Sequence, residues 1–323
     1  MMTLLLVVLG VLGGLLAALL LFTVWTAGRV EKALPPHGQF ADVPGGRIHY
    51  WQQGSGTAIV MVHGLGGQSA NFAYGVVEQL ADDFRVIVID RPGAGYSTRN
   101  SDASATLREQ AKFVAEFIRA LGLQRPWLVG HSLGGAISLQ AALDYPDAIG
   151  GLVLLAPLTH VPPRVPQMFR RLEIQSKLMR RTIAWTLATP MGMVIGPRVI
   201  RAIFAPEPVP RDIATRGRGL LSLRPSHFYN VSTDLMSVNA DLQKMTQLYG
   251  NLRVPVAILF GTSDEVLDYR QHGQAMQQKV AHLQLNLVEG GHMLPVTQPE
   301  LCAQFIRAAV AATLSGRVWA EQA

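Results

Sequence analysis

Ser132 stands in a setting that favours nucleophilic chemistry. It lies at the centre of a Gly-x-Ser-x-Gly pattern, between the apolar run 127–129, which predicts a buried strand, and a helical pattern over residues 134–144. A sharp turn from strand to helix forces such a serine into a strained conformation, and the flanking glycines let the two backbones approach. The hydroxyl then faces a cleft above the positive end of the helix dipole. We therefore predict that Ser132 is a nucleophile.

A serine hydroxyl needs a base to take its proton and an acid to orient that base. His292 closely follows the last predicted strand, and Asp264 follows the strand before it. The Gly-Thr-Ser-Asp context of Asp264 is also typical of a turn. Asp268, slightly later, and Asp234, near the end of a helical stretch, are the alternatives. We predict His292 as the base and Asp264 as the acid.

An acyl-transfer site also needs hydrogen-bond donors for the charge that develops on the carbonyl oxygen. The backbone N–H of Leu133, directly after Ser132, is one candidate. The backbone N–H of Leu65, in the His-Gly-Leu-Gly-Gly loop at residues 63–67, is the other. We expect His63 to hold this loop in place rather than to act as a base or a metal ligand.

Short apolar runs alternate with helical patterns from residue 40 onward, which is typical of right-handed strand–helix–strand units. The strand runs are 47–52, 58–62, 86–89, 127–129, 152–155, 256–260 and 283–288. The helical patterns lie near 70–81, 103–121, 134–144, 269–280 and 299–313. Between residues 157 and 250 the alternation stops, and Pro-rich pieces and further helical patterns take its place. We predict an α/β fold, a mostly parallel sheet flanked by helices, with a helical insertion.

The order Ser132, Asp264, His292 and the elbow Gly-His-Ser-Leu-Gly-Gly resemble the α/β-hydrolase fold family. The loop at residues 63–67 and the stretch Asp-Arg-Pro-Gly-Ala-Gly-Tyr-Ser at residues 90–97 look like two further motifs of that family. We interpret the second of these motifs as structural. The resemblance implies that the helical insertion is a cap, a lid over the cleft that shapes the substrate pocket.

The resemblance also implies a serine hydrolase that cleaves carboxylic esters through an acyl-enzyme. Epoxide hydrolases and haloalkane dehalogenases of this fold use an aspartate nucleophile, so the serine at position 132 argues against both. C–C bond hydrolysis, cofactor-free haloperoxidase chemistry, thioester hydrolysis and acyl transfer stay open on the same triad. The loop at 63–67 lacks the Ser-Gly-rich pattern usual in meta-cleavage C–C hydrolases. A non-catalytic binding or scaffold protein is an alternative of another class.

The sequence carries no phosphate loop, cysteine-based metal cluster or dinucleotide fingerprint, so we expect no cofactor and no metal. The single cysteine, Cys302, excludes an intrachain disulfide. Apolar residues make up 49% of the 323 residues and charged residues 15%, which argues against disorder.

Residues 3–25 carry no charge and are long enough to cross a hydrocarbon core of about 30 Å. A signal peptide would have a basic start, an apolar core of about 7–15 residues and small residues before the cleavage site. The segment lacks these features, so we expect an uncleaved anchor, with a signal peptide or a buried core helix as the alternatives. Arg29 and Lys32 on its C-terminal side favour a cytoplasmic catalytic domain under the positive-inside rule.

The net charge is +6, and residues 160–225 alone carry twelve Arg or Lys against three acidic residues. Apolar residues are interleaved with these charges and no nucleic-acid motif occurs, so the segment favours an anionic membrane over nucleic acid as partner. Five apolar residues of this segment recur at helical spacing. Such a stripe is typical of a helix face that packs on the core, but beside a membrane anchor it also fits a face that contacts the membrane. The stripe comprises Met168, Leu172, Met179, Ile183 and Leu187.

The anchor and the basic, apolar cap together predict a lipophilic ester substrate, such as a monoacylglycerol. The sequence does not predict an oligomeric state. The predicted organisation is a transmembrane anchor at 1–28, a linker at 29–39, a hydrolase core at 40–156 and 251–315, and a helical cap at 157–250.

Overall fold

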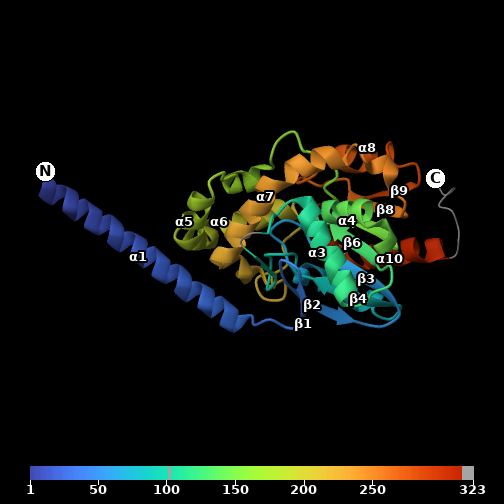
Figure 1. The fold of residues 1–323 in the computed structure, drawn as a ribbon, viewed down its shortest axis with the longest axis horizontal. Helices are drawn as coiled ribbons and strands as arrows, with labels where there is room; N and C mark the ends of the chain where they lie inside the picture. Colours follow the sequence, from blue (N-terminus) through green and yellow to red (C-terminus); the bar gives the residue numbers. More distant parts are fainter. Residues whose placement is uncertain (101–102, 315–323) are drawn as a thin grey trace.

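The computed structural model describes residues 1–100 and 103–314. Residues 101, 102 and 315, which fall within the predicted core segments, lie outside the described residues. The centre of the molecule is a nine-stranded sheet in the order β1-β2-β4-β3-β6-β7-β8-β9, with β5 paired to β2 (Figure 1). The strands are β1 Gln39–Val43, β2 Gly46–Gln53, β3 Thr57–Val62, β4 Phe84–Ile89, β5 Thr98–Arg99, β6 Trp127–His131, β7 Gly151–Leu155, β8 Val256–Gly261 and β9 Leu283–Val288.

Six neighbouring strands, from β4 across to β9, run parallel. Within the described residues, antiparallel pairing involves β2 with β1, β4 and β5 at one edge of the sheet. The mostly parallel sheet predicted from the strand–helix alternation is therefore confirmed. Parallel strands end at the same edge of a sheet, so residues that directly follow β6, β8 and β9 are brought close together.

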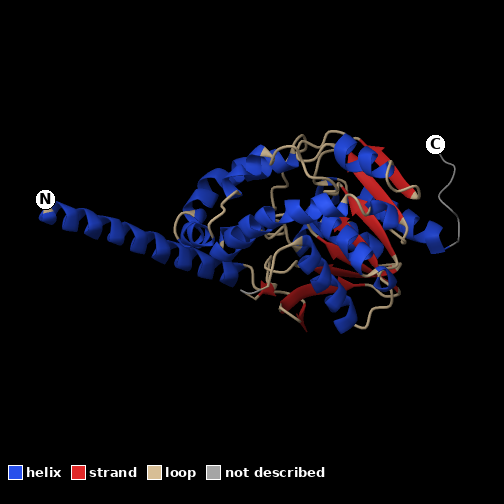
Figure 2. Cartoon of the chain, turned by 45° about the horizontal axis from the view of Figure 1, so that its top comes forward, coloured by secondary structure: helices blue, strands red, loops and turns tan. Residues whose placement is uncertain are grey.

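Helices cover both faces of this sheet (Figure 2). The core helices are α2 Val76–Leu80, α3 Leu107–Ala120, α4 Leu133–Asp144, α8 Ala275–Gln277, α9 Leu294–Thr297 and α10 Pro299–Leu314. Side chains of β3 alternate between the two faces: Val60 and Val62 pack in the cluster that contains α3 and α4, whereas Ile59 and Met61 pack in the cluster that contains α2 and α10. Because both faces are buried, the strand reads as a continuous apolar run.

Residues 157–250 lie between β7 and β8 and contain no strand within the described structure. The helices of this insertion are α5 Lys177–Trp185, α6 Ala188–Phe204 and α7 Pro225–Met245, with 3₁₀ turns at Gln167–Leu172 and Gly219–Leu223. The insertion is anchored to the core by α7, since Val238, Leu242 and Met245 are buried in the same cluster as α3 and α4.

The apolar stripe of the insertion does not lie on one helix. The 3₁₀ turn that holds Met168 ends at Leu172, and α5 begins after four intervening residues, the last of which is Ser176, whose hydroxyl accepts the N–H of Met179. Ser176 is thus an N-cap, and N-caps start helices rather than continue them. As a result Met179 is exposed, whereas Met168 and Leu172 are half-buried.

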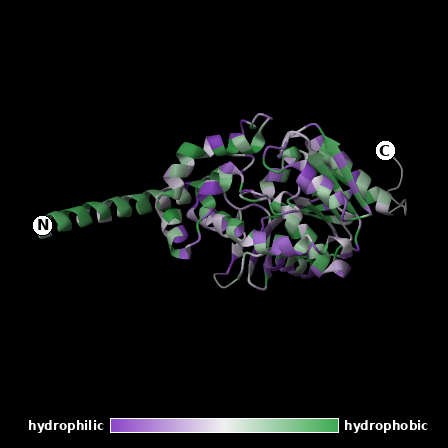
Figure 3. Ribbon diagram, turned by 90° about the horizontal axis from the view of Figure 1, so that it is seen from above, coloured by the Kyte–Doolittle hydropathy of each residue, from purple (hydrophilic) through white to green (hydrophobic). Residues whose placement is uncertain are grey.

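The N-terminal helix α1, Met2–Ala33, projects from the body of the molecule and is apolar along most of its length (Figures 1 and 3). In the described part of the chain it is the single unbroken helix long and apolar enough to cross a membrane, with a mean hydropathy of 2.9 over an 18-residue window. It continues beyond the predicted anchor boundary at residue 28. Of the predicted linker at 29–39, residues 34–38 lie outside helices and strands.

The last turns of α1 pack against the insertion. Thr23, Thr26 and Val30 lie on one stripe of the helix and are buried there. Near the end of the helix, the carboxylate of Glu31 pairs with the guanidinium of Arg224 at 3.4 Å. The base of α1 is therefore part of the folded body, while the rest of the helix stands free of it.

Candidate active site

Ser132 forms the turn between β6 and α4. The strand ends at His131 and the helix begins at Leu133, so the serine alone separates them. Its φ of +54° and ψ of −119° form a conformation that residues with side chains rarely adopt. A Cβ on Gly130 would lie 2.6 Å from the carbonyl oxygen of Gly134, so position 130 needs glycine. The strained turn holds the serine at the carboxyl end of the strand, as the sequence pattern predicts.

His292 and Asp264 meet just beyond the ends of β9 and β8. The Nδ1 atom of His292 lies 2.7 Å from Oδ2 of Asp264, and the two side chains are 4% and 0% exposed. The other carboxylate oxygen accepts the backbone N–H groups of Val266 and Leu267 at 2.8 and 2.9 Å. Burial opposes the charge on Asp264, but His292 and the two amides outweigh burial and lower the pKa of this carboxyl. An ionised carboxylate at Nδ1 favours the tautomer whose Nε2 can accept a proton.

His131 ties the serine turn to the loop that carries His292. Its Nε2–H donates to the carbonyl oxygen of His292 at 2.9 Å, and the two ring centroids are 5.0 Å apart. Burial and the nearby His292 lower the pKa of His131 to about 3, so the ring is neutral near pH 7. Since His131 and Ser132 are adjacent, this bond fixes the position of the serine relative to His292. Both Ser132 and His292 are nearly covered, at 9% and 4% exposed.

The loop at residues 63–67 lies directly against the serine. A Cβ on Gly64 would lie 2.9 Å from Cβ of Ser132 and 3.3 Å from its Oγ, so only glycine allows this approach. The N–H of Leu65, the next residue, donates no hydrogen bond to another described residue. Leu133 is the first residue of α4, and amides at that position have no partner within the helix. Both expected oxyanion donors thus belong to residues beside the serine.

His63 uses both ring nitrogens to hold this loop. Its Nδ1–H donates to the carbonyl of Gly64 at 2.8 Å, and its Nε2 accepts the backbone N–H of Arg91 at 2.9 Å. Burial, aided by the positive charge of Arg91, lowers the pKa of His63 to about 3. The Arg91 guanidinium also donates to the carbonyls of His63 and Gly64. The structural roles predicted for His63 and for the stretch at 90–97 agree with these contacts.

The two alternative acids lie in other interactions. Asp234, on α7, receives hydrogen bonds from Arg91 and Arg99 at 2.9 and 2.8 Å, and all three side chains are at most 4% exposed. Asp268 accepts the backbone N–H of Arg270 at 2.9 Å and its side chain is 55% exposed. Of the three candidates, Asp264 is the carboxylate that the structure brings to His292.

Glu207, from the insertion, contacts the loop that carries His292, a role that was not predicted from the sequence. Its Oε1 accepts the N–H of Gly291, the residue before His292, at 2.7 Å, and its buried Oε2 has no partner among the described residues. On the other side of the histidine, Met293 packs against Phe204 at the end of α6. The insertion thereby holds the loop on both sides of His292. A lone carboxylate between two prolines in a basic segment is the one sequence signal for this residue.

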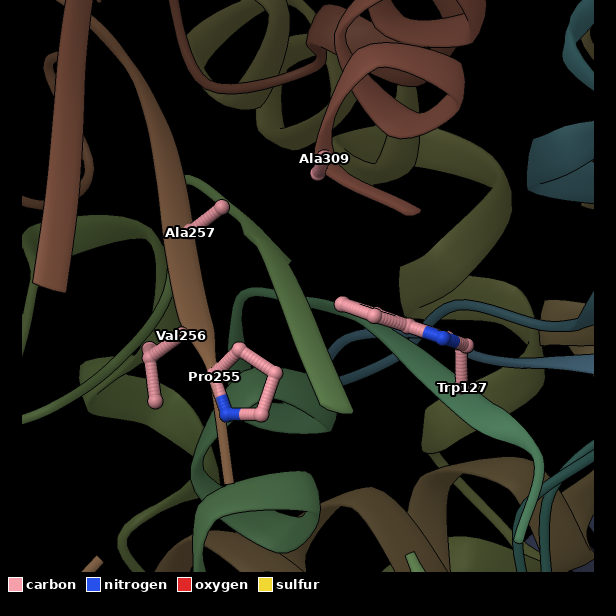
Figure 4. Close-up of a pocket in the computed structure, with 5 residues that line it drawn as sticks. All are labelled: Trp127, Pro255, Val256, Ala257 and Ala309. Atoms are coloured by element: carbon pink, nitrogen blue, oxygen red, sulfur yellow. The ribbon is translucent and has the colours of Figure 1, made fainter. Parts of the chain in front are cut away.

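Across residues 1–100 and 103–314, no group of three or more His, Cys, Asp or Glu side chains is placed to hold a metal ion. A narrow space at the amino-terminal ends of β6 and β8 lies at the opposite edge of the sheet from Ser132 (Figure 4). Its lining is Trp127, Pro255, Val256, Ala257 and Ala309. This apolar space is remote from the strand ends that carry the candidate site.

Curated relatives of this chain differ in how much of it they match. The dihydrolipoyllysine-residue acetyltransferase component of the acetoin cleaving system of Cupriavidus necator is 38% identical over 121 residues, which are 37% of this chain and 32% of that protein. The chain therefore matches about a third of the length of this relative. Protein Rv2715 of Mycobacterium tuberculosis is 28% identical over 289 residues, which are 82% of this chain and 78% of that protein.

A solved structure and a family model match most of the chain. The crystal structure of a membrane phospholipase A has a TM-score of 0.67 and 24% identity and covers 97% of both chains, a likeness that shows a shared fold. The family model described as the alpha/beta hydrolase fold matches residues 57–299, which contain Ser132, Asp264 and His292. With its parallel sheet, its serine turn and this match, the chain belongs to the α/β-hydrolase family.

Proposed function

We propose that the protein is a membrane-associated serine hydrolase that cleaves carboxylic esters of lipophilic compounds. The observation that carries the proposal is the 2.7 Å hydrogen bond between His292 and Asp264 at the edge of the sheet where Ser132 occupies its strained turn. A nucleophile, a base and an orienting acid are the groups that acyl transfer requires. Membership of a hydrolase family supports the same class of reaction.

In the proposed reaction, Oγ of Ser132 attacks the ester carbonyl carbon while Nε2 of His292 takes the hydroxyl proton. The N–H groups of Leu65 and Leu133 donate to the oxyanion of the tetrahedral intermediate. His292 then passes the proton to the leaving alcohol, which leaves an acyl group on the serine. The same nitrogen then takes a proton from water as the water attacks the acyl carbonyl carbon, and it returns this proton to Oγ of Ser132 when the bond between the acyl group and the serine breaks and the acid leaves. Asp264 stays ionised and stabilises the imidazolium.

Membrane association is supported by α1 and by the way it is attached. A signal peptide cleaved near residue 27 would remove Thr23 and Thr26 and expose the surface of the insertion that these residues cover. An uncleaved anchor keeps this contact and the ion pair between Glu31 and Arg224. The similar solved structure that covers 97% of this chain is described as a membrane phospholipase A, which supports the same proposal. A lipid ester is therefore the substrate class that we propose.

The test of the nucleophile uses the full chain in detergent and a fluorophosphonate probe. We expect the probe to label wild-type protein at Ser132, and Ser132→Ala to lose both labelling and ester hydrolysis, by on the order of 10⁴–10⁶ in kcat. Ser263→Ala, which changes an exposed serine beside Asp264, is the matched control and should keep both. Labelling of Ser132→Ala would show that another residue is the nucleophile.

The test of the reaction class compares substrates that share an acyl group. We expect p-nitrophenyl esters and monoacylglycerols to be cleaved, with kcat/KM rising as the acyl chain lengthens. Vinylogous diketones test C–C hydrolysis, acyl thioesters test thioesterase activity, and added alcohols test acyl transfer on the same serine. If any of these reactions is faster than ester hydrolysis, that reaction and not ester hydrolysis is the activity of the protein. A chain that labels at Ser132 but turns over none of them would point to the non-catalytic class.

A further inference from the structure

The helix α1 fixes where the insertion lies relative to a bilayer. Residues 2–22 are exposed apart from one half-buried position, and Thr23 is the first side chain that is fully covered. Twenty-one helical residues at 1.5 Å each span about 31 Å, close to the thickness of a hydrocarbon core of about 30 Å. The contact between α1 and the insertion therefore begins at the depth where the hydrocarbon core ends.

The part of the insertion held at this point is the pair of helices α5 and α6, residues 177–204, which we call the α5–α6 elbow. The two helices bend by 82° at a short break between Trp185 and Ala188. The hydroxyl of Thr23 donates to the carbonyl oxygen of Thr186, which lies in the break, at 3.4 Å. The bend of the elbow is thus level with the last exposed turn of the free part of α1.

Several large apolar side chains of the elbow are exposed to solvent. Those at least 42% exposed include Leu178, Met179, Trp185, Leu187, Met193 and Val194. A single exposed leucine is ordinary, but a group on two consecutive helices indicates a surface that another apolar phase covers. Taken together, the two helices are as apolar as a broken membrane span.

Positive charge accompanies this apolar surface. Lys177 and Arg181 are exposed on α5, and neither forms an ion pair with any residue that the structure describes. Arg181 lies on the same face of α5 as Leu178, Thr182 and Trp185, and these four residues border open space at the surface. A guanidinium beside exposed Leu and Trp side chains suits a lipid surface, where charged headgroups border acyl chains.

We propose that the α5–α6 elbow is embedded in the headgroup layer of the leaflet from which α1 emerges. This inference rests on the anchoring of α1 that is part of the proposed function. Lipid is the occupant because a spanning helix packed against the elbow leaves the outer face of the elbow at the membrane surface, whichever side the body lies on. Trp25 and Trp185, both exposed, then lie at the depth where tryptophan is enriched in membrane proteins.

The experiment measures depth in the bilayer and does not depend on catalysis. The full chain is reconstituted in phosphatidylcholine nanodiscs with an environment-sensitive fluorophore on a single introduced cysteine, in variants Leu178→Cys, Val194→Cys, Leu12→Cys and Lys112→Cys. The native Cys302 is fully buried, and the unlabelled background is measured on wild-type protein. Leu12 reports the anchor, and Lys112, exposed on α3, reports a water-facing site on the core.

We expect labels at positions 178 and 194 to be quenched by nitroxides on the lipid acyl chains and shielded from iodide in the water. The label at position 112 should show the reverse. Iodide quenching at 178 and 194 equal to that at 112, with position 12 still quenched by lipid, would overturn the inference but leave the anchor. Shielding from iodide without nitroxide quenching would mean that protein covers the elbow, which also overturns it. Loss of lipid quenching at position 12 would overturn the anchor itself.

Discussion

Polar side chains at the carboxyl-terminal edge of the sheet are buried and bonded, whereas apolar side chains on the α5–α6 elbow are exposed. Asp264, His63 and Asp90 each make at least two hydrogen bonds beneath the surface. Leu178 and Val194 of the elbow are 75% and 68% exposed. Burying polar atoms costs free energy unless partners are in place, and exposing apolar atoms costs free energy unless an apolar phase covers them. The interactions of the polar side chains at the sheet edge are therefore satisfied within the protein, whereas the apolar side chains of the elbow need a partner outside it.

The basic residues of the insertion divide in the same way. Arg180 and Arg224 are buried and donate hydrogen bonds within the protein, so they belong to the fold. Lys177 and Arg181 are exposed and remain available to anions outside the chain. Counting charges along the sequence does not distinguish the two buried arginines from the two exposed basic residues. The structure distinguishes them by their burial.

The largest effect should come from the acid at the sheet edge. Asp264→Asn keeps the size of the side chain but removes the charge that fixes the tautomer of His292, so we expect kcat on a soluble ester to fall by about 10⁴. Asp268→Asn, at a largely exposed carboxylate, is the matched control and should keep most activity. An equal loss in the two variants would mean that Asp264 is not the orienting acid.

Breaking the ion pairs of Asp234 should cost stability more than chemistry. Asp234→Asn leaves the buried guanidinium groups of Arg91 and Arg99 without their counter-charge, and breaking a buried pair costs about 3–5 kcal/mol of folding free energy. Thermal unfolding followed by circular dichroism measures the change, with Asp241→Asn on the same helix as control. Loss of kcat in the folded variant without loss of stability would instead identify Asp234 as the acid.

A smaller effect is expected where the insertion meets the site. Glu207→Ala removes the acceptor of the Gly291 N–H and should lower kcat by roughly 10- to 100-fold, because a hydrogen bond to a charged group is worth about 1.5–3 kcal/mol. Glu207→Gln keeps an acceptor oxygen and should restore part of the activity. Glu173→Ala, at an exposed carboxylate of the same insertion, should behave as wild type. If Gln and Ala variants lose activity equally, the bond to Gly291 does not position His292.

The smallest effect concerns the elbow. In the double variant Lys177→Glu/Arg181→Glu, turnover of a lipid ester in anionic nanodiscs should drop a few-fold, since a basic residue near an anionic surface contributes about 1 kcal/mol. Hydrolysis of a short soluble ester should not change. Lys112→Glu/Arg253→Glu makes the same charge change on the core and should leave both rates intact. A fall in the soluble-ester rate would place the two residues in the fold rather than at the membrane.

Local patterns were enough to predict the strands that carry the site. The apolar run 283–288 coincides with β9, and the run 256–260 matches β8 to within one residue. Because a buried parallel strand is apolar throughout and ends where polar residues begin, the position of Asp264 and His292 just beyond these runs could be predicted. β1, with the sequence Gln-Phe-Ala-Asp-Val, was not predicted, since an exposed edge strand has no such run.

Contacts between distant segments could not be predicted in this way. Glu207 and Gly291 are 84 positions apart, and neither residue belongs to a pattern with a period. The apolar stripe suggested one helix, but the helical backbone is interrupted at residues 173–176, where the hydroxyl of Ser176 caps α5. A hydrophobic period predicts which residues share a face only while the helix continues.

The buried histidines of the site make the fold sensitive to acid. His63 and His131 have pKa values of about 3 in the folded chain, whereas a histidine in an unfolded chain has a pKa of about 6.5. Above about pH 6.5 the two rings are neutral in both the folded and the unfolded chain, so their protonation costs no folding stability. Below that pH the two imidazole rings bind protons in the unfolded chain but stay neutral in the folded chain. The equilibrium constant for folding therefore falls by roughly tenfold per pH unit for each ring until the pH nears 3. Thermal unfolding between about pH 7 and pH 4 should show a steadily falling Tm, and a constant Tm would contradict this expectation. The fold that holds the strained serine turn is therefore more stable near neutral pH than in acid.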